Sequence, residues 1–435
     1  MVCAVGLAQT LGGETDVRTP GHQHPKWDTL KLTAQGTHLE VCLNCDRLIE
    51  VDDNTYDQGV IGLGALGRIQ FKDLSVHGQA IRLVQPWREL PGTAPAFIYP
   101  FKSDTVDLTK PTRPRSSCPN GVVLEDGQIM LVRDLNETGE SVMIRSNDHG
   151  RTWSDELVID RKISWPFQHK DGRLSALTSV ILDRDGHVLG RMTTELIKQM
   201  DAGKFEGRLE TMLTYSHDGG RTWGEPQPFI SGGKPLSAYG NFFGYLGLHR
   251  LSDDSILYCP YYGKTEHTIA EERTNQTFVL SSEDDGNTWS VPRPVEETHL
   301  DTNEGTVAEL SNGDLLMFMR SVRSPFLWRA RSTDKGRTWL PIEKTQLTLD
   351  CPLMLHHSSG LIVLQTRGGA LQISADDGVT WGPVWNVGHC VHMGCMLEAA
   401  DGALLFAHLD AGFADLTKVR AFRLGVTAEG PVPCD

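Results

Sequence analysis

The residues best suited to chemistry stand at the ends of short apolar stretches in the larger, C-terminal part of the chain. Arginines close four of these stretches, at Arg133, Arg191, Arg320 and Arg367. A planar guanidinium group matches a carboxylate or phosphate with paired hydrogen bonds. The whole chain carries a net charge of −15. Arginines gathered at one place in such an acidic chain would therefore mark a site for an acidic or polyhydroxylated ligand.

Carboxylates stand at comparable positions. The carboxyl groups of Asp134, Glu137, Glu140 and Glu304 could act as general acids or bases, and His392 is a further candidate general base. The opposing interpretation is that the arginines form scaffold ion pairs with Asp134, Glu304 and Asp350, but such pairs contribute little in a solvent-exposed opening.

An eight-residue pattern, S-x-D-x-G-x-T-W, identifies the elements that must position these groups. It occurs five times, at Ser146–Trp153, Ser216–Trp223, Ser282–Trp289, Ser332–Trp339 and Ser374–Trp381. A repeat at such intervals indicates a repeat architecture. The Asp can accept backbone N–H bonds within a turn, and the Gly takes a positive φ. We expect each Trp to pack between neighbouring sheets, so the repeat is interpreted as scaffold rather than as a catalytic or calcium site.

A second repeat is interleaved with the first, in which two apolar strands flank a tight turn. The predicted turns are Asp126-Gly127, Asp185-Gly186, Asp253-Asp254, Asn312-Gly313, Ser359-Gly360 and Asp401-Gly402. Asp-Gly and Asn-Gly supply the positive φ of a short hairpin. Each unit then contains four strands, and radial repetition of four-stranded sheets is a β-propeller. Six hairpins predict an all-β fold with six blades, and a strand near Ala94–Phe101 is expected to close the ring.

The topology predicts which residues meet at one opening of the propeller. If all the turns named above share one face, the opposite face receives the starts of first strands and the ends of second strands. The expected ends are Arg133-Asp134, Arg191, Tyr261-Tyr262, Arg320, Arg367 and His408–Asp410. The expected starts are Ser117, Arg173, Tyr239–Asn241, Asn303-Glu304, Asp350 and His389–His392. Tyr239, Tyr261 and Tyr262 therefore join the arginines as candidate substrate-binding residues.

The propeller region, residues 86–435, resembles the sialidase (neuraminidase) superfamily, whose Asp-box or BNR repeat the five turns match. The phrase NEGTVAELSNGDLLMFMR is similar to a family hairpin and implies a base at Glu304 and a carboxylate-binding Arg320. TRGGALQISADDG resembles the segment of another triad arginine, here Arg367. VRDLNETGESVMIRSNDHG resembles the loop of the acid/base aspartate, here Asp134, with Glu137 and Glu140 as competitors. Glycoside cleavage typically needs an acid opposed to a nucleophile or base, so the resemblance implies Asp134 as the acid/base and Glu304 as the base or nucleophile.

Two departures from that resemblance distinguish this chain from an ordinary sialidase. Ser117-Cys118-Pro119 stands where the family has an Arg-Ile-Pro phrase, although Arg115 is near. His392-Met393-Gly394 stands where the family's nucleophilic tyrosine opens the last blade. The tyrosines of blade three would have to serve from across the pocket. Alternatively, His392 could replace the tyrosine as a general base, which would permit an inverting or eliminative route. Loops at Thr193–Gly207 and Gly263–Asn275 are expected to wall it.

Residues 1–85 are predicted to form a separate β segment. Strands are expected at 30–34, 38–43 and 47–51, with a further Gly-rich apolar stretch at 59–66. The phrases WDTLKLTAQGTHLEVCLN and GVIGLGALGRIQFKDLSV resemble the C-terminal half of a concanavalin-like jelly roll. Half a β-sandwich exposes strand edges, so the segment is expected to pack on another domain or to self-associate. A mere spacer is an alternative.

Composition excludes several classes of function. The strongly acidic balance argues against a nucleic-acid-binding surface. No apolar run approaches the ~20 residues that span a bilayer, and no signal peptide is recognised. The nine cysteines are spaced irregularly and do not suggest a disulfide framework. The compartment is left open between the cytoplasm and a truncated secreted precursor. The cluster His389–Cys395 is interpreted as buried thiols with pocket histidines rather than as a metal site, and no cofactor is expected.

These observations predict a sialidase-like, exo-acting glycoside hydrolase for a terminal, acidic sugar. Its carbohydrate substrate would differ from that of a standard sialidase. Two other classes stay open: a non-catalytic glycan-binding propeller, and a polysaccharide lyase that uses His and Tyr.

Overall fold

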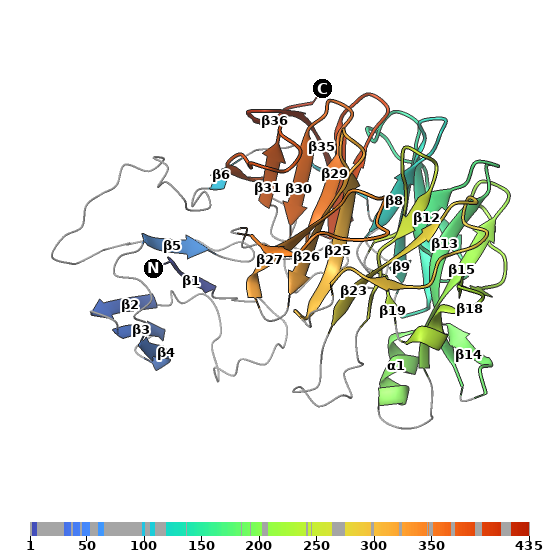
Figure 1. The fold of residues 1–435 in the computed structure, drawn as a ribbon, viewed down its shortest axis with the longest axis horizontal. Coiled ribbons are helices and arrows are strands. Elements are labelled where there is room, and N and C mark those ends of the chain that lie inside the picture. The colour runs from blue at the N-terminus through green and yellow to red at the C-terminus, as the bar shows by residue number, and fades with distance from the viewer. Residues whose placement is uncertain are drawn as a thin grey trace. The chain divides into compact units, whose positions relative to one another are not determined.

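The described strands of the computed structural model fall into two compact units, with β1 to β5 in the first and β6 onward in the second (Figure 1). The structure describes residues 2–6, 30–35, 38–43, 46–52, 60–64, 98–100, 105–108 and 119–434, the last range with gaps at 136, 184, 192, 202–207, 241, 245, 263–274, 297–299, 322–323, 346, 348–350, 367–369, 388–393 and 410–418. Among these residues, no helix is long and apolar enough to cross a membrane.

The N-terminal unit contains an antiparallel sheet and a separate parallel pair. The sheet runs β2 (Leu30–Gln35), β3 (His38–Leu43) and β4 (Asp46–Asp52), and the pair joins β1 (Val2–Gly6) to β5 (Val60–Gly64). The three strands expected between residues 30 and 51 are confirmed. The jelly-roll assignment and the boundary at residue 85 stay predictions, because residues 65–97 lie outside the described part of the chain.

The second unit is a propeller of six antiparallel sheets, as predicted. Blade one contains β8 (Asn120–Val123), β9 (Ile129–Leu135), β10 (Glu140–Ser146) and β11 (Leu157–Ile159). Blade two contains β12 (Ser164–Gln168), β13 (Leu174–Leu182), β15 (Arg208–Ser216) and β16 (Gln227–Pro228). Blade three contains β20 (Leu248–Arg250), β21 (Ile256–Tyr258) with β22 (Tyr261–Tyr262), β23 (Gln276–Ser282) and β24 (Arg293–Pro294).

The remaining blades follow the same plan. Blade four contains β25 (Thr302–Glu309), β26 (Leu315–Ser321), β27 (Ser324–Ser332) and β28 (Glu343–Lys344). Blade five contains β29 (Leu353–His356), β30 (Ile362–Thr366), β31 (Ala370–Ser374) and β32 (Val384–Asn386). Blade six contains β33 (Gly394–Glu398), β34 (Leu404–Leu409) and β35 (Val419–Thr427), which also pairs with β36 (Gly430–Val432). Between blades two and three lie β17 (Ile230–Ser231), β18 (Lys234–Pro235), the 3-10 helix η1 (Leu236–Tyr239) and β19 (Phe242–Phe243).

Blade six is closed by a strand from the beginning of the propeller. That strand is β7 (Thr105–Asp107), which pairs antiparallel with β35. The prediction that Ala94–Phe101 closes blade six is wrong. The described part of that stretch, β6 (Ile98–Pro100), instead runs parallel to β32 on the outer edge of blade five. Two short strands close together in sequence fitted the same role, and pattern alone did not decide between them.

Blade two turns earlier than the sequence pattern predicted. Residues 169–173 join its first two strands, and Asp185-Gly186 instead joins β13 to an additional strand, β14 (Val188–Arg191). The helix α1 (Thr194–Asp201) follows. Both Gly172 and Gly186 have a positive φ, of 83° and 88°, so two turns satisfied one pattern. Arg173 therefore lies in a hairpin rather than at a strand start, and Arg191 ends β14 rather than the second strand.

The five repeat turns share one hydrogen-bonding pattern. In the first, the Ser146 hydroxyl donates to Asp148 Oδ1 at 2.7 Å and accepts from the Gly150 N–H at 2.8 Å. The Thr152 N–H and hydroxyl donate to the two oxygens of Asp148 at 2.8 and 2.5 Å. Bonds from Thr152 also lower the pKa of Asp148 below its ordinary value. Both carboxylate oxygens are thus engaged inside the turn, which fits the predicted scaffold role.

Each repeat turn packs on the preceding blade. Trp223 lies in a core cluster with Met130 and Val132 of blade one, and Trp289 lies in one with Phe167 and Leu177 of blade two. Trp339, Trp381 and Trp153 join the clusters between blades three and four, four and five, and six and one. The sixth interface has no repeat turn, and there Trp385 packs against the shared cluster of blades five and six.

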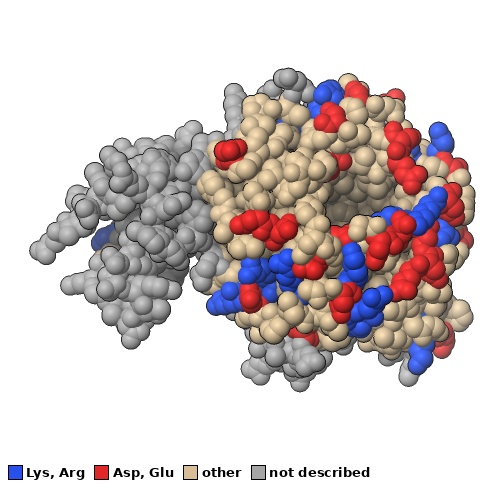
Figure 2. Space-filling view, turned by 45° about the horizontal axis from the view of Figure 1, so that its top comes forward, with Lys and Arg blue, Asp and Glu red and all other residues tan. Residues whose placement is uncertain are grey.

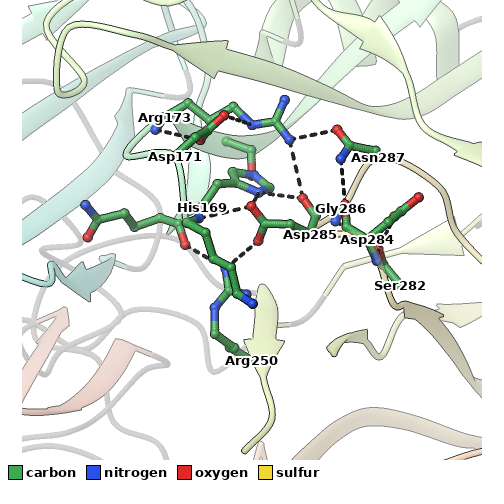
Figure 3. A network of polar contacts seen from close by, with 12 residues as sticks. His169, Asp171, Arg173, Arg250, Ser282, Asp284, Asp285, Gly286 and Asn287 are labelled. Carbon is green, nitrogen blue, oxygen red and sulfur yellow. Dashed lines mark hydrogen bonds and ion pairs between the residues drawn. The ribbon is translucent and has the colours of Figure 1, made fainter. Parts of the chain in front are cut away.

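Figure 3 shows how the third repeat turn binds the hairpin of blade two. The buried His169 ring lies with Nδ1 2.9 Å from the Asp285 carbonyl oxygen and Nε2 2.8 Å from the Ser175 hydroxyl. Burial, and then the positive charge of Arg173, lower the pKa of His169. The ring is therefore neutral at physiological pH, with Nδ1–H as donor. Arg250 of blade three donates to Asp285 Oδ1 at 2.7 Å.

The turn-bearing face carries interspersed charges. In Figure 1, α1 and β14 lie on the lower side of the propeller, and Figure 2 brings the opposite side forward. Acidic and basic side chains surround a central hollow there. One pair, Arg151 with Asp401 at 3.1 Å, joins the first repeat turn to the hairpin of blade six. Such exposed pairs each contribute at most about 1 kcal/mol, so apolar packing carries most of the interblade stability.

We predict that Trp289→Ala destabilises the protein by about 3–5 kcal/mol. The side chain is buried in the cluster between blades two and three, and its indole N–H donates to the Gly286 carbonyl at 3.1 Å. Guanidinium unfolding followed by circular dichroism measures the change. Leu340→Ala is the control, because Leu340 also follows a repeat turn but is 50% exposed. Equal effects of the two substitutions would contradict the role of the repeat tryptophans in holding neighbouring blades together.

Candidate functional site

Glu304 and Arg320 form an ion pair at the predicted opening, on the face opposite the turns. Glu304 lies near the start of β25 and Arg320 near the end of β26, the strand that pairs with it. Arg320 Nη1 donates to both carboxylate oxygens of Glu304 at 3.1 Å. The Glu304 side chain is 12% exposed and that of Arg320 is 29% exposed. The structure thus brings these two residues together in an ion pair, which is the contact that the scaffold interpretation expected, and their side chains still reach solvent. Their catalytic and substrate-binding roles stay predictions.

The backbone of Glu304 is strained. The register of β25 with β26 shifts between Asn303 and Thr306, which leaves Glu304 and Gly305 in a bulge. Glu304 has a φ of 48°, a left-handed value that costs a non-glycine residue of order 1–3 kcal/mol and that concentrates at functional sites. A β-bulge re-aims a side chain. The bulge here delivers the Glu304 carboxylate to Arg320.

Tyr261 belongs to the same cluster. It lies on β22, and burial raises the pKa of its phenol to about 12. The negative charge of Glu304 raises this pKa further, Arg320 lowers it, and the Cys351 thiol adds a smaller upward effect. Groups from blades three, four and five therefore act on one phenol. Tyr261 is protonated at neutral pH, and a nearby base must take its proton before its oxygen can attack.

Trp165 is a site residue that the sequence interpretation missed. It lies near the start of β12 with a φ of 54°, and its backbone N–H donates to Asn120 Oδ1 at 2.5 Å. The partly buried indole packs against three of the interblade clusters, including the one between blades five and six that Tyr261 also contacts. A residue of blade two that touches this cluster must reach across the propeller axis. The misplaced hairpin of blade two had hidden it.

Asp134 is almost completely buried, whereas the acid catalyst predicted from the sequence should be accessible to substrate. Its side chain is 4% exposed, and Lys162 Nζ lies 3.2 Å from Oδ2. The Ser141 hydroxyl donates to Oδ1 at 2.9 Å, and the Ser164 hydroxyl donates to Oδ2 at 3.3 Å. This carboxylate thus binds blade one to the start of blade two. Its competitor Glu137 is exposed, in the connection between β9 and β10.

Arg133 points away from Asp134, as neighbouring strand residues do. Its Nη2 donates to Glu156 at 2.8 Å, and the two side chains are 6% and 3% exposed. A buried pair of this kind is costly to separate. The contacts of Arg133 therefore favour a scaffold role in an ion pair, an interpretation that the sequence left open. Its role toward substrate stays a prediction.

The other predicted residues are less informative. Tyr239 lies in η1, where its hydroxyl donates to the Ser231 carbonyl at 3.2 Å, beside the segment that follows the third repeat turn. The side chains of Arg191 and Tyr262 lie outside the described part of the chain, and so do Arg367 and His392 entirely. Their predicted roles are untested.

Metal-binding donors also meet at one place among the described residues. Asp183, Asp185 and His187 bring their donor atoms together in the turn between β13 and β14. Asp183 Oδ1, however, accepts the N–H groups of Asp185 and His187 at 2.9 and 2.8 Å. These bonds explain the arrangement as a hairpin turn.

Known proteins resemble this chain along most of the propeller. The BNR repeat-like domain family matches residues 192–389. A sialidase of Clostridium perfringens is 26% identical over 237 residues, 51% of this chain and 59% of that protein. A sialidase of Micromonospora viridifaciens is 24% identical over 306 residues, 62% of this chain and 45% of that protein. The chain spans about half the length of the curated relatives it matches.

Solved structures agree on the fold. A Dyadobacter fermentans protein of unknown function gives a TM-score of 0.58 at 17% identity, covering 78% of this chain and all of that one. The NanB sialidase of Streptococcus pneumoniae gives 0.53 at 12% identity, covering 90% of this chain and 82% of that one. In its five repeat turns, its six blades and its sequence relatives, this chain is similar to the BNR-repeat propellers of the sialidase superfamily.

Proposed function

We propose that the chain is a sialidase-like glycoside hydrolase that releases a terminal acidic sugar from a glycan. The observation that carries this proposal is the Glu304–Arg320 pair, set by strained backbone beside Tyr261 at the opening of the propeller. The relatives named sialidase support the same reaction class. The absent Arg-Ile-Pro phrase and the missing tyrosine of the last blade favour a sugar other than the usual one.

The resting ion pair suggests how substrate turns the site on. Arg320 neutralises Glu304 in the free protein. A ligand carboxylate competes for the guanidinium, because both are anions that bind it through charge-assisted hydrogen bonds. A Glu304 carboxylate that loses this partner becomes a stronger base. It can then take a proton from the Tyr261 phenol or from a water, which makes either oxygen a nucleophile toward the anomeric carbon.

The leaving oxygen needs a proton from the other side of the sugar. Asp134 keeps the role assigned from sequence, and Glu137 is its competitor because it is exposed whereas Asp134 is held by three polar neighbours. If Asp134 is the acid, Asp134→Asn lowers the rate of cleavage. If Glu137 is the acid, Glu137→Gln lowers that rate and Asp134→Asn acts only through interblade stability. The enclosure of Asp134 also favours the second candidate function, a propeller that binds an acidic glycan without cleaving it.

Trp165 offers an aromatic surface near the axis of this opening. Ligand pockets are lined mostly by apolar and aromatic groups with a few polar ones. Among the described residues, its indole N–H has no hydrogen-bond partner, and Trp165 shares an interblade cluster with Tyr261. We infer that the indole packs against the apolar face of the bound sugar, while Arg320 holds its acidic group.

Glu304→Gln is expected to lower kcat by about 10²–10⁴-fold, the usual contribution of a positioned base. Arg320→Lys is expected to raise KM for an acidic sugar by roughly 10- to 100-fold, because a charge-assisted bond is lost. Kinetics on a panel of acidic and neutral aryl glycosides measure both. The exposed pair Arg337–Glu283, 2.8 Å apart on the turn face, supplies the matched controls Glu283→Gln and Arg337→Lys.

The outcomes separate the three functions. Binding of an acidic sugar without turnover of any glycoside would favour the binding propeller. Unsaturated products that absorb in the near ultraviolet would favour a lyase. Equal effects of Glu304→Gln and Glu283→Gln would overturn the assigned base.

Tyr261→Phe tests which oxygen attacks. If the phenol is the nucleophile, kcat falls by at least about 10²-fold and the wild type retains the anomeric configuration. If water is the nucleophile, the substitution is mild and the configuration inverts. Nuclear magnetic resonance of the first-formed sugar reads the stereochemistry directly, so each result is informative by itself.

Trp165→Phe is expected to raise KM by roughly 3- to 10-fold with little change in kcat, because a smaller ring keeps part of the aromatic contact. Trp328→Phe is a control, since Trp328 packs in a cluster between blades three and four. A KM unchanged relative to wild type would remove Trp165 from the binding surface.

A further inference from the structure

Glu296 is a buried carboxyl in the segment that leads from β24 to β25. It is 4% exposed. The Thr302 hydroxyl donates to Oε1 at 2.7 Å, and the backbone N–H groups of Leu300 and Thr302 also bond the carboxyl. Oε2 is buried without a partner among the described residues. One side chain thus holds both ends of the turn that enters the inner strand of blade four.

Neighbouring strands fix the same turn from two other directions. The Thr277 N–H of β23 donates to the Thr302 hydroxyl at 3.1 Å, and Gln276 Nε2 donates to the Glu296 carbonyl at 2.6 Å. From β26, the Ser321 hydroxyl donates to the Leu300 carbonyl at 2.9 Å. The Thr302 hydroxyl therefore accepts a hydrogen bond from β23 and donates one to Glu296.

The segment that this network holds contains the strain of the site. Asp301 has a φ of 60° and Glu304 a φ of 48°. The Asn275 backbone and side-chain N–H groups donate to Asp301 Oδ1 at 2.7 and 2.9 Å. Backbone in such conformations persists only where the surroundings over-determine it. The bonds to Glu296 are part of that over-determination.

We propose that Glu296 is a positioning residue, which holds residues 300–304 in the strained conformation that presents Glu304 to Arg320 and Tyr261. It acts through Thr302 and touches no substrate. Its kinetic consequences rest on the proposed glycosidase function, whereas its effect on the segment does not.

The charge state of Glu296 should govern how well it holds the segment. Burial raises its pKa to about 7, and the nearby negative charge of Asp301 adds to this. The groups facing it from β23 and β26 that the structure describes, namely Gln276, Thr277 and Ser321, are uncharged. The folded state therefore binds this proton more tightly than the unfolded state. Stability from this group is full below the unfolded pKa and decreases as pH rises to about 7.

Hydrogen exchange read by mass spectrometry tests the proposal without any substrate. In Glu296→Ala, amides of residues 300–306 should exchange about 10-fold faster or more, which corresponds to losing roughly one buried hydrogen bond. Peptides of the turn-bearing face should be unchanged. In the wild type, exchange of the same segment, corrected for intrinsic rates, should rise from pH 6 to 8. Glu296→Gln mimics the neutral acid and should remove that rise.

Kinetics give the second readout on the full chain. The wild-type kcat on an acidic aryl glycoside should fall above pH 7, and Glu296→Gln should flatten this limb while keeping activity near pH 6. Glu296→Ala should lower kcat by about 10- to 100-fold, as misplacement of a catalytic group does. The control Glu283→Gln should change neither profile.

The two arms fail in different ways. If the wild type cleaves no glycoside, the proposed function fails and the exchange arm still decides on Glu296. If exchange of residues 300–306 is the same in Glu296→Ala, Glu296→Gln and wild type, the positioning role is overturned whatever the activity.

Discussion

The contact between each repeat turn and the preceding blade is the interaction on which the rest of the structure depends. A single blade exposes two apolar faces and cannot bury them alone. The Ser-Asp-Thr bonds rigidify the turn, and rigid backbone lets the following Trp enter the neighbouring core in a fixed orientation. Five interfaces use this contact, and at the sixth, between blades five and six, Trp385 packs against the shared cluster. Blade six, which has no repeat turn, is completed by β7. The ring closes where the repeat is absent, so the chain begins and ends its propeller there.

Because the repeat turns stabilise the ring from one face, strained backbone at the opposite opening can be tolerated. The residue before each repeat Gly has a positive φ in all five turns, at His149, Gly219, Asp285, Lys335 and Asp377. The other non-glycine residues with positive φ include Trp165, Asp301, Glu304 and Cys351. Strain on the turn face recurs in every repeat turn and serves packing. Strain at the strand starts occurs in blades two, four and five, at Trp165, Glu304 and Cys351, and in blades two and four it coincides with a shift in strand register. The opening opposite the turns therefore collects strained backbone from several blades, Glu304 among it.

Sequence patterns predicted the features that repeat from blade to blade. They failed at features that occur in single blades. The blade number, five of the six hairpin turns and the placing of Glu304 and Arg320 at one opening follow from periodic signals that fix strand ends. The turn at Asp171-Gly172 was missed because Asp185-Gly186 offers the same chemistry one strand later, and that error displaced Arg173 and concealed Trp165. Tyr261 was placed on the correct strand, but its closeness to Glu304 depends on a bulge. A bulge leaves no periodic signal, since it is a local departure from period two.

Burial decides which arginine of this acidic chain can serve a ligand. Arg133 and Arg320 each pair with a glutamate at about 3 Å, yet the Arg133 pair is almost completely enclosed and that of Arg320 is partly open. Exchanging a partner inside the protein would strand a buried Glu156 charge, which costs several kcal/mol. Glu304, by contrast, stays in contact with solvent when a ligand takes its partner. An arginine that binds an acidic ligand should be oriented by its carboxylate partner and exposed enough for the ligand to replace that partner. Among the described pairs at this opening, Arg320 with Glu304 meets both conditions.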